Sequence, residues 1–141
     1  MLFTPLITLL ALALPPQPQP AASTLSSAQL IDTARKLAHD EGWPIDQKIY
    51  TFDPMKPDVD DGFDSIGLYK KAHLVRMYSI ERTTGDIVDF MRGCNVFEFS
   101  DVQDLQNQIR KTSGASSLPI DKLAAKVGCS KLFVVRNRWV Q

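Results

Sequence analysis

Apolar residues recur at helical spacing between residues 26 and 44, which is the clearest periodic pattern in the chain. Ser26 and Gln29 have the spacing of a capping box at the start of this segment. Gly42 and Pro44 supply the residues that commonly end a helix. The pattern therefore predicts an amphipathic helix whose apolar face consists of Leu30, Ile31, Ala34, Leu37 and Ala38.

The next third of the chain is rich in β-branched and aromatic residues, which favour strands. We expect a short strand over residues 47–55 and a long one over residues 67–82, separated by an acidic loop at 56–65. The turn motif Thr84-Gly85-Asp86 follows, and Gly85 can adopt a positive φ there. Residues 87–93 would form the return strand, so that 67–91 make a hairpin, and residues 94–99 extend the strand character.

The last third of the chain combines two short helical patterns with a final strand. Ser100 is expected to cap a helix over residues 101–111, and residues 118–128 form a second helix with Pro119 in its first turn. Residues 131–140 predict a closing strand. The chain therefore predicts the α+β class, with an amphipathic helix packed on an antiparallel sheet and with extra short helices and a closing strand in its C-terminal half.

The first 22 residues have the features of a signal peptide. Leu6–Leu14 is an apolar run too short to span a bilayer, and small residues follow at Ala21–Ser23. The prolines between these two segments argue against a buried N-terminal helix. We expect residues 1–22 to be removed, residues 23–26 to be a linker, and residues 27–141 to form one domain. The protein would then be periplasmic or secreted, with no membrane span after cleavage.

The net charge of zero gives no overall attraction to nucleic acid. The charge is unevenly distributed, however, because residues 110–141 hold seven Lys or Arg and one acid, whereas residues 1–109 hold nine and fifteen. The basic segment either complements acidic groups in the fold or in another subunit, or forms a basic binding patch.

Cys94 and Cys129 are the two cysteines of the chain. In an oxidising compartment an even number suggests a disulfide, and two unrelated buried thiols are the alternative. Their spacing excludes a CxxC metal or redox motif.

The stretch around residues 78–88 resembles the PepSY domain, a small exported or membrane-associated bacterial module with a cystatin-like helix-on-sheet shape. Tyr78, Ile80, the Thr84-Gly85-Asp86 turn and the pair Ile87-Val88 carry the resemblance, which spans residues 27–91 and leaves 94–141 uncovered. Glu81 departs from the family, which often has an aspartate there. The resemblance implies a binding or inhibitory role, such as restraining a protease, and supplies no catalytic residues.

The acids of the turn region are expected to be solvated, with no evident cause for a pKa shift. The sequence also shows no nucleophile elbow, phosphate-binding loop or HExxH motif, and His39 and His73 are isolated. We therefore expect a protein that is not an enzyme and that needs no cofactor. Possible contact residues are Tyr50, Tyr69 and Trp139, although aromatic residues in strands more often belong to a core.

A calcium site in the acidic loop is one alternative. Residues 53–64 could supply several oxygens, but the EF-hand pattern fails because Pro57, Val59 and Leu68 would occupy ligand positions. A solvated loop is the competing interpretation. The possible metal-binding residues are Asp53, Asp58, Asp60, Asp61 and Asp64.

A helix-turn-helix over residues 120–139 is a second alternative, with Gly128 in the turn and Arg136 on the recognition helix. The strand preference of residues 131–139 and the predicted export argue against DNA binding. The sequence thus favours a non-catalytic exported module that binds a protein partner in the envelope, such as a protease, and no nucleic acid.

Overall fold

The computed structural model describes residues 15–16, 25–56 and 61–136 of the chain. The predicted signal peptide therefore lies almost wholly outside the described residues, as do Asp58, Asp60 and Trp139. The elements in chain order are α1 (Ser27–Glu41), β1 (Tyr50–Met55), β2 (Phe63–Lys70), β3 (His73–Glu81), β4 (Ile87–Asp89), β5 (Asn95–Glu98), the 3-10 helix η1 (Ser100–Val102), α2 (Gln103–Ser113), α3 (Ile120–Val127) and β6 (Phe133–Arg136).

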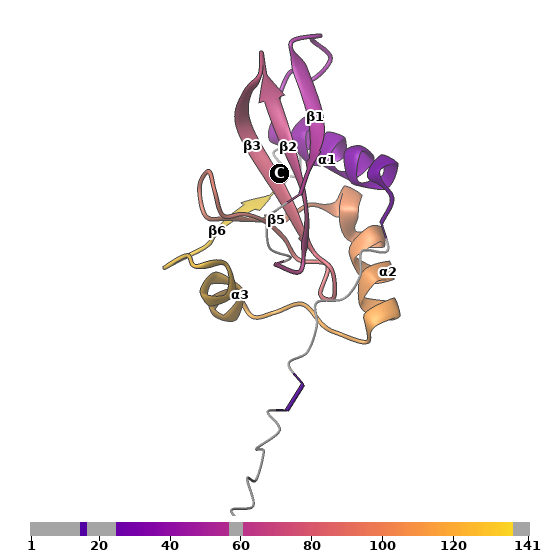
Figure 1. Ribbon diagram of the computed structural model, residues 1–141, viewed down its shortest axis with the longest axis vertical. Coiled ribbons are helices and arrows are strands. Elements are labelled where there is room, and N and C mark those ends of the chain that lie inside the picture. The colour runs from indigo at the N-terminus through magenta and orange to yellow at the C-terminus, as the bar shows by residue number, and fades with distance from the viewer. Residues whose placement is uncertain (1–14, 17–24, 57–60, 137–141) are drawn as a thin grey trace, which may run out of the picture.

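The strands of the described chain form one sheet in the order β1-β2-β3-β4-β5-β6 (Figure 1). Each neighbouring pair from β1 to β5 is antiparallel, whereas β6 returns to pair with β5 in parallel. The parallel return is possible because η1, α2 and α3 form the crossover between the two strands. This architecture confirms the predicted α+β class.

The N-terminal helix begins and ends as the sequence predicts. The Ser26 hydroxyl accepts from the Gln29 amide while the Gln29 side chain accepts from the Ser26 amide, which completes the capping box. Gly42 ends α1 with a φ of 89°, a conformation that favours glycine. The helix packs against the sheet through Leu30, Ala34 and Leu37.

Two apolar layers cover opposite faces of the sheet. The larger layer joins α1 and α2 to residues such as Phe52, Tyr78 and Phe97. The smaller layer packs α3, through Leu123 and Ala124, against the other face near β4 and β5. Helix α3 therefore covers β4, β5 and the start of β2 on the sheet face away from α1.

The predicted long strand at residues 67–82 is wrong in detail. The chain forms a hairpin of β2 and β3 instead, with Lys71 and Ala72 in its tight turn at φ values of 47° and 66°. Left-handed conformations of this kind are unfavourable for non-glycine residues. Because neither turn position is a glycine, the local sequence does not indicate a turn here. The predicted acidic loop is also shorter, because β2 already begins at Phe63.

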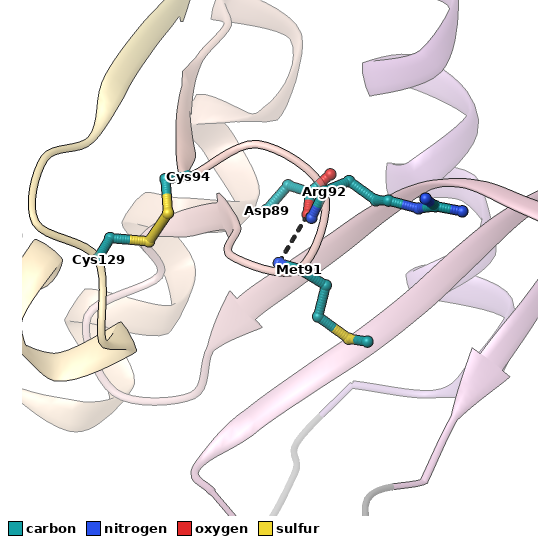
Figure 2. Close-up of a disulfide and its surroundings, with 5 residues drawn as sticks. All are labelled: Asp89, Met91, Arg92, Cys94 and Cys129. Atoms are coloured by element: carbon teal, nitrogen blue, oxygen red, sulfur yellow. Dashed lines mark hydrogen bonds between the residues drawn. A yellow bond between two sulfur atoms is a disulfide. The ribbon is translucent and has the colours of Figure 1, made fainter.

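Two further expectations concern the C-terminal half. Ser100 does not cap a helix: it lies in η1, whose start has no side-chain cap. Cys94 and Cys129 do form a disulfide, with their Cα atoms 6.0 Å apart (Figure 2). The bond ties the segment after α3 to the entry of β5. No helix in the described ranges is both long and apolar enough to cross a membrane.

Candidate protein-contact site

Glu81, at the end of β3, is buried rather than solvated, with 3% of its surface exposed. Its carboxylate accepts hydrogen bonds from the Thr83 and Thr84 amides and from Lys126 Nζ of α3, the last at 3.0 Å. Burial alone would raise the pKa of Glu81, but the bonds from Thr84, Thr83 and Lys126 outweigh it and lower the pKa to about 2. The expectation of a solvated acid with an ordinary pKa is therefore wrong.

One face of α2 binds the backbone of the turn. Three side chains, spaced along successive turns of the helix, donate to three consecutive carbonyl oxygens. The pairs are Gln106 to Gly85 at 2.9 Å, Arg110 to Thr84 at 2.5 Å and Ser113 to Thr83 at 2.5 Å. The turn thus holds the helix in place through its main chain.

Asp86 of the turn motif joins the turn to the segment that leads into α3. It is buried, and its carboxylate accepts from the Ser117 hydroxyl at 2.5 Å and from the Leu118 amide at 3.0 Å. Arg110 lies 3.4 Å from the same carboxylate. The turn that resembles the PepSY motif is therefore the point to which the C-terminal half is attached.

Asp89 is the third buried acid in this part of the chain, after Glu81 and Asp86. It accepts from the amides of Met91 and Arg92, at 3.1 and 2.8 Å, and fixes the loop before Cys94 (Figure 2). Its other oxygen lies 3.4 Å from Arg76 Nη1. Arg76 also pairs with Glu41 at the end of α1. These contacts couple the loop to the first helix.

Each of these acids has hydrogen-bond donors that belong to the fold. A cleft of about 520 Å³ does lie between α2 and the segment leading to α3. However, the polar side chains in its wall include Asp86, Gln106 and Arg110. These side chains already form hydrogen bonds between α2 and the turn. These hydrogen bonds hold the turn, α2 and the segment before α3 together.

The acidic loop does not assemble a metal site among the described residues, where no three His, Cys, Asp or Glu side chains are close enough to share an ion. The Asp61 carboxylate accepts from the Phe63 amide, and Asp64 pairs with Arg82 at 3.1 Å. Asp53 is exposed in β1. Asp58 and Asp60 lie outside the described residues, so the calcium hypothesis stays a prediction for them.

The helix-turn-helix alternative is wrong over the residues that the structure describes. Helix α3 ends at Val127, and the segment predicted to read DNA forms β6 from Phe133 to Arg136 instead. Arg136 pairs with Glu98 of β5 at 3.1 Å rather than projecting from a recognition helix. Together with the pairs Lys126–Glu81 and Arg110–Asp86, this contact shows the basic segment complementing acids of the same fold.

The two aromatic contact candidates within the described chain lie on different faces. Tyr50 packs on the α1 side, edge-on to Trp43. The Tyr69 ring and Leu74 lie over Gly67 on the opposite face, where a Cβ on Gly67 would come within 2.6 Å of Tyr69 Cε2. The absence of that Cβ is what lets the ring lie flat against the sheet.

The same face carries a hollow of about 250 Å³, which no pattern in the sequence predicted. Met55, Met77, Phe90 and Met91 line it, and Met91 is 60% exposed. Figure 2 shows the Met91 side chain pointing away from the disulfide. Methionine side chains adapt to varied apolar partners, so the hollow suits contact with a protein.

No protein-family model matches the chain, and comparison with curated protein sequences gives no match either. A solved structure is similar in fold: a chain from the structure of a type VI secretion system effector-immunity complex from Pseudomonas protegens. It is 16% identical, with a TM-score of 0.60 over 80% of this chain and 98% of that chain. The likeness covers most of the domain and shows a shared fold.

Proposed function

We propose that this chain is a non-catalytic, exported module that binds a protein partner and inhibits or shields it. The observation that carries the proposal is an apolar hollow on the sheet face away from α1, which Met55 and the exposed Met91 border. An exposed methionine of this size, beside a hollow that an apolar side chain can enter, is typical of a contact surface.

The shared fold supports a role in a protein complex. The similar chain comes from an effector-immunity complex, in which one protein binds another. The buried acids support the absence of catalysis, because Glu81, Asp86 and Asp89 each accept hydrogen bonds from the fold itself. Donors of the fold therefore already occupy the oxygens that a catalytic acid would need for its substrate.

Export is part of the proposal. The Cys94–Cys129 disulfide is compatible with a periplasmic or extracellular location, since disulfides persist in oxidising compartments. The apolar run near the N-terminus would direct the chain there.

Two classes of partner follow from the two resemblances. The PepSY-like turn suggests a protease, and the similar structure suggests an effector of a secretion system. Both are proteins that a cell restrains by direct binding, and both would be met in the envelope.

Site-specific photo-crosslinking in the native host tests the proposal. A photoreactive residue at position 91 should give one discrete crosslinked protein, whereas the same residue at exposed Lys111 of α2 should not. The captured protein is then expressed alone in the periplasm. The proposal predicts that it cleaves envelope proteins or reduces growth, and that co-expression of this chain prevents the effect. Crosslinks that are absent, or equal at both positions, would contradict it.

A further inference from the structure

Strand β6 is the last strand of the sheet in the described chain, with β5 on one side and no described strand on the other. The Phe133 amide donates to the Cys94 carbonyl oxygen, so Phe133 turns its main-chain groups toward β5. Along a strand paired in parallel, successive residues turn these groups to alternate sides. Val134 therefore directs its N–H and C=O away from β5.

Apolar side chains accompany this exposed edge. Phe133 is 57% exposed and Val134 is 39% exposed, and Ile120 at the start of α3 is 46% exposed. These are most of the large hydrophobic side chains that the described chain exposes, since Met91 is the other one. Natural proteins usually blunt a sheet edge with charges, prolines or bulges, so an edge bearing exposed apolar residues is consistent with use in binding.

A groove runs beside the edge. Its volume is about 350 Å³, and Ile120, Ala124 and Leu132 supply much of its apolar lining. Val134 lies opposite Val96, which packs in the layer covered by α3, so Val134 faces the side of the sheet that holds the groove. A strand placed against β6 would direct every second side chain toward this groove.

The edge carries a lysine that forms no ion pair with a described residue. Lys131 lies 5.3 Å from the centre of the Phe133 ring and is exposed. The nearby acids are Asp121 and Glu98, and Glu98 already pairs with Arg136. An incoming segment with carboxylates would therefore complement the edge, and one with several lysines would not.

We propose that β6 accepts an extended, acidic and apolar segment of the partner protein as an added strand. Apolar side chains on one face of that segment would lie beside Val134 and the groove, and carboxylates on its other face would lie near Lys131 on the Phe133 side of the edge. The inference rests on the proposed function, because it specifies how the partner binds. It uses a different surface from Met91, so the two can fail separately.

Val134→Pro is the sharpest variant for this edge. It removes the outward N–H and leaves the bonds between β5 and β6, since proline is tolerated at an edge strand whose N–H faces solvent. Val134→Thr is the matched control, because it keeps the N–H and the β-branched shape. Phe133→Pro would remove the bond to Cys94 and serves as a control for damage to the fold.

The experiment presents the folded, oxidised protein to a phage-displayed library of random twelve-residue peptides. The proposal predicts enriched peptides that alternate apolar residues with Asp or Glu. Their affinity should fall at least tenfold in Val134→Pro and change less than twofold in Val134→Thr. Peptides that bind Val134→Pro as well as the unmodified protein, or a library that yields no enriched sequence, would overturn it.

Light scattering after size-exclusion chromatography tests whether a second copy of the chain, rather than a partner protein, occupies the edge. If the unmodified protein is a dimer and Val134→Pro is a monomer, a second copy of the chain occupies the edge, and the proposal is wrong. If the protein captured at position 91 still binds Val134→Pro with unchanged affinity, the added strand is refuted while the proposed function stands.

Discussion

Gln106 of α2 donates a hydrogen bond from its Nε2 to the carbonyl oxygen of Gly85, 2.9 Å away. The same helix residue limits what can stand at position 85, because a Cβ built on Gly85 would lie 3.1 Å from the Gln106 Cα. Gly85 also has a φ of 71°. The turn and the helix therefore need a glycine for two separate reasons.

Gly85→Ala should lower the free energy of unfolding by about 2 kcal/mol, from left-handed strain plus crowding against α2. Gly114→Ala is the matched control, since Gly114 has a similar φ of 74° but no atom within 4 Å of its built Cβ. The control should cost about 1 kcal/mol. Urea denaturation of both variants measures the difference. Equal losses would mean that α2 does not press against the turn.

The lowered pKa of Glu81 gives stability a definite pH dependence. Because the folded pKa is about 2 and the ordinary value is 4.5, this contribution is present above pH 4.5 and is lost as the pH falls toward 2. Glu81→Gln should lower stability at pH 7 by about 2 kcal/mol, a figure reduced for the partial exposure of Lys126. Thermal melts between pH 2 and 7 should show a flatter profile for the variant.

Glu98→Gln is the control for this measurement, because Glu98 forms an exposed pair with Arg136. Its effect at pH 7 should stay below about 0.5 kcal/mol. A Glu81→Gln profile that parallels the unmodified protein throughout this range would refute the pKa shift and its structural cause.

The pKa of Asp40, in the last turn of α1, is shifted in the opposite direction to that of Glu81. Only 4% of its surface is exposed, and its Oδ2 has no hydrogen-bond partner in the described structure. Burial and the neighbouring Asp101 raise its pKa. A raised carboxyl pKa means that folding favours the protonated form, so this group destabilises the fold as the pH rises above its ordinary value of 3.8.

Asp40→Asn should therefore stabilise the protein at pH 7, by about 1 kcal/mol, since the amide carries no charge and can donate to Asp101. The gain should disappear near pH 3. Asp32→Asn on the exposed side of the same helix is the control, and it should give no gain, because it removes the pairing of Asp32 with Lys36. Calorimetry at both pH values provides the comparison.

The disulfide closes a chain separation of 35 residues around β5, α2 and α3. Replacing both cysteines with serine should lower the free energy of unfolding by about 3–4 kcal/mol if the main effect is loop closure in the unfolded chain. Denaturation of the oxidised protein with and without reductant gives an independent value. A loss below 1 kcal/mol in both measurements would show that α2 and α3 dock without the bond.

Local patterns in the sequence were enough to predict the first helix, the disulfide partners and the glycine of the turn. The capping box of Ser26 and Gln29 depends only on residues close in the sequence, and so does the positive φ of Gly85. Such local features can be predicted from the sequence alone. The hairpin turn at Lys71 and Ala72 was missed because pairing of β2 with β3, rather than residue preference, imposes its conformation.

The burial of the turn acids could not be predicted from local sequence. Arg110 lies 24 residues from Asp86, and Lys126 lies 45 residues from Glu81. A short acidic turn looks solvated until the fold brings these donors to it. The methionine hollow was missed for a similar reason, because it brings together Met55 of β1, Met77 of β3 and Met91 after β4, which are far apart in the sequence.

The central claim is that the buried acids hold the fold while the methionine hollow binds a protein. Affinity for the protein captured at position 91, measured for Glu81→Gln and Met91→Asp, tests it most directly. We predict that Glu81→Gln binds within twofold of the unmodified protein at a temperature where it is folded. Met91→Asp should keep its melting temperature and lose at least tenfold in affinity. Loss of binding in folded Glu81→Gln, with none in Met91→Asp, would contradict the account.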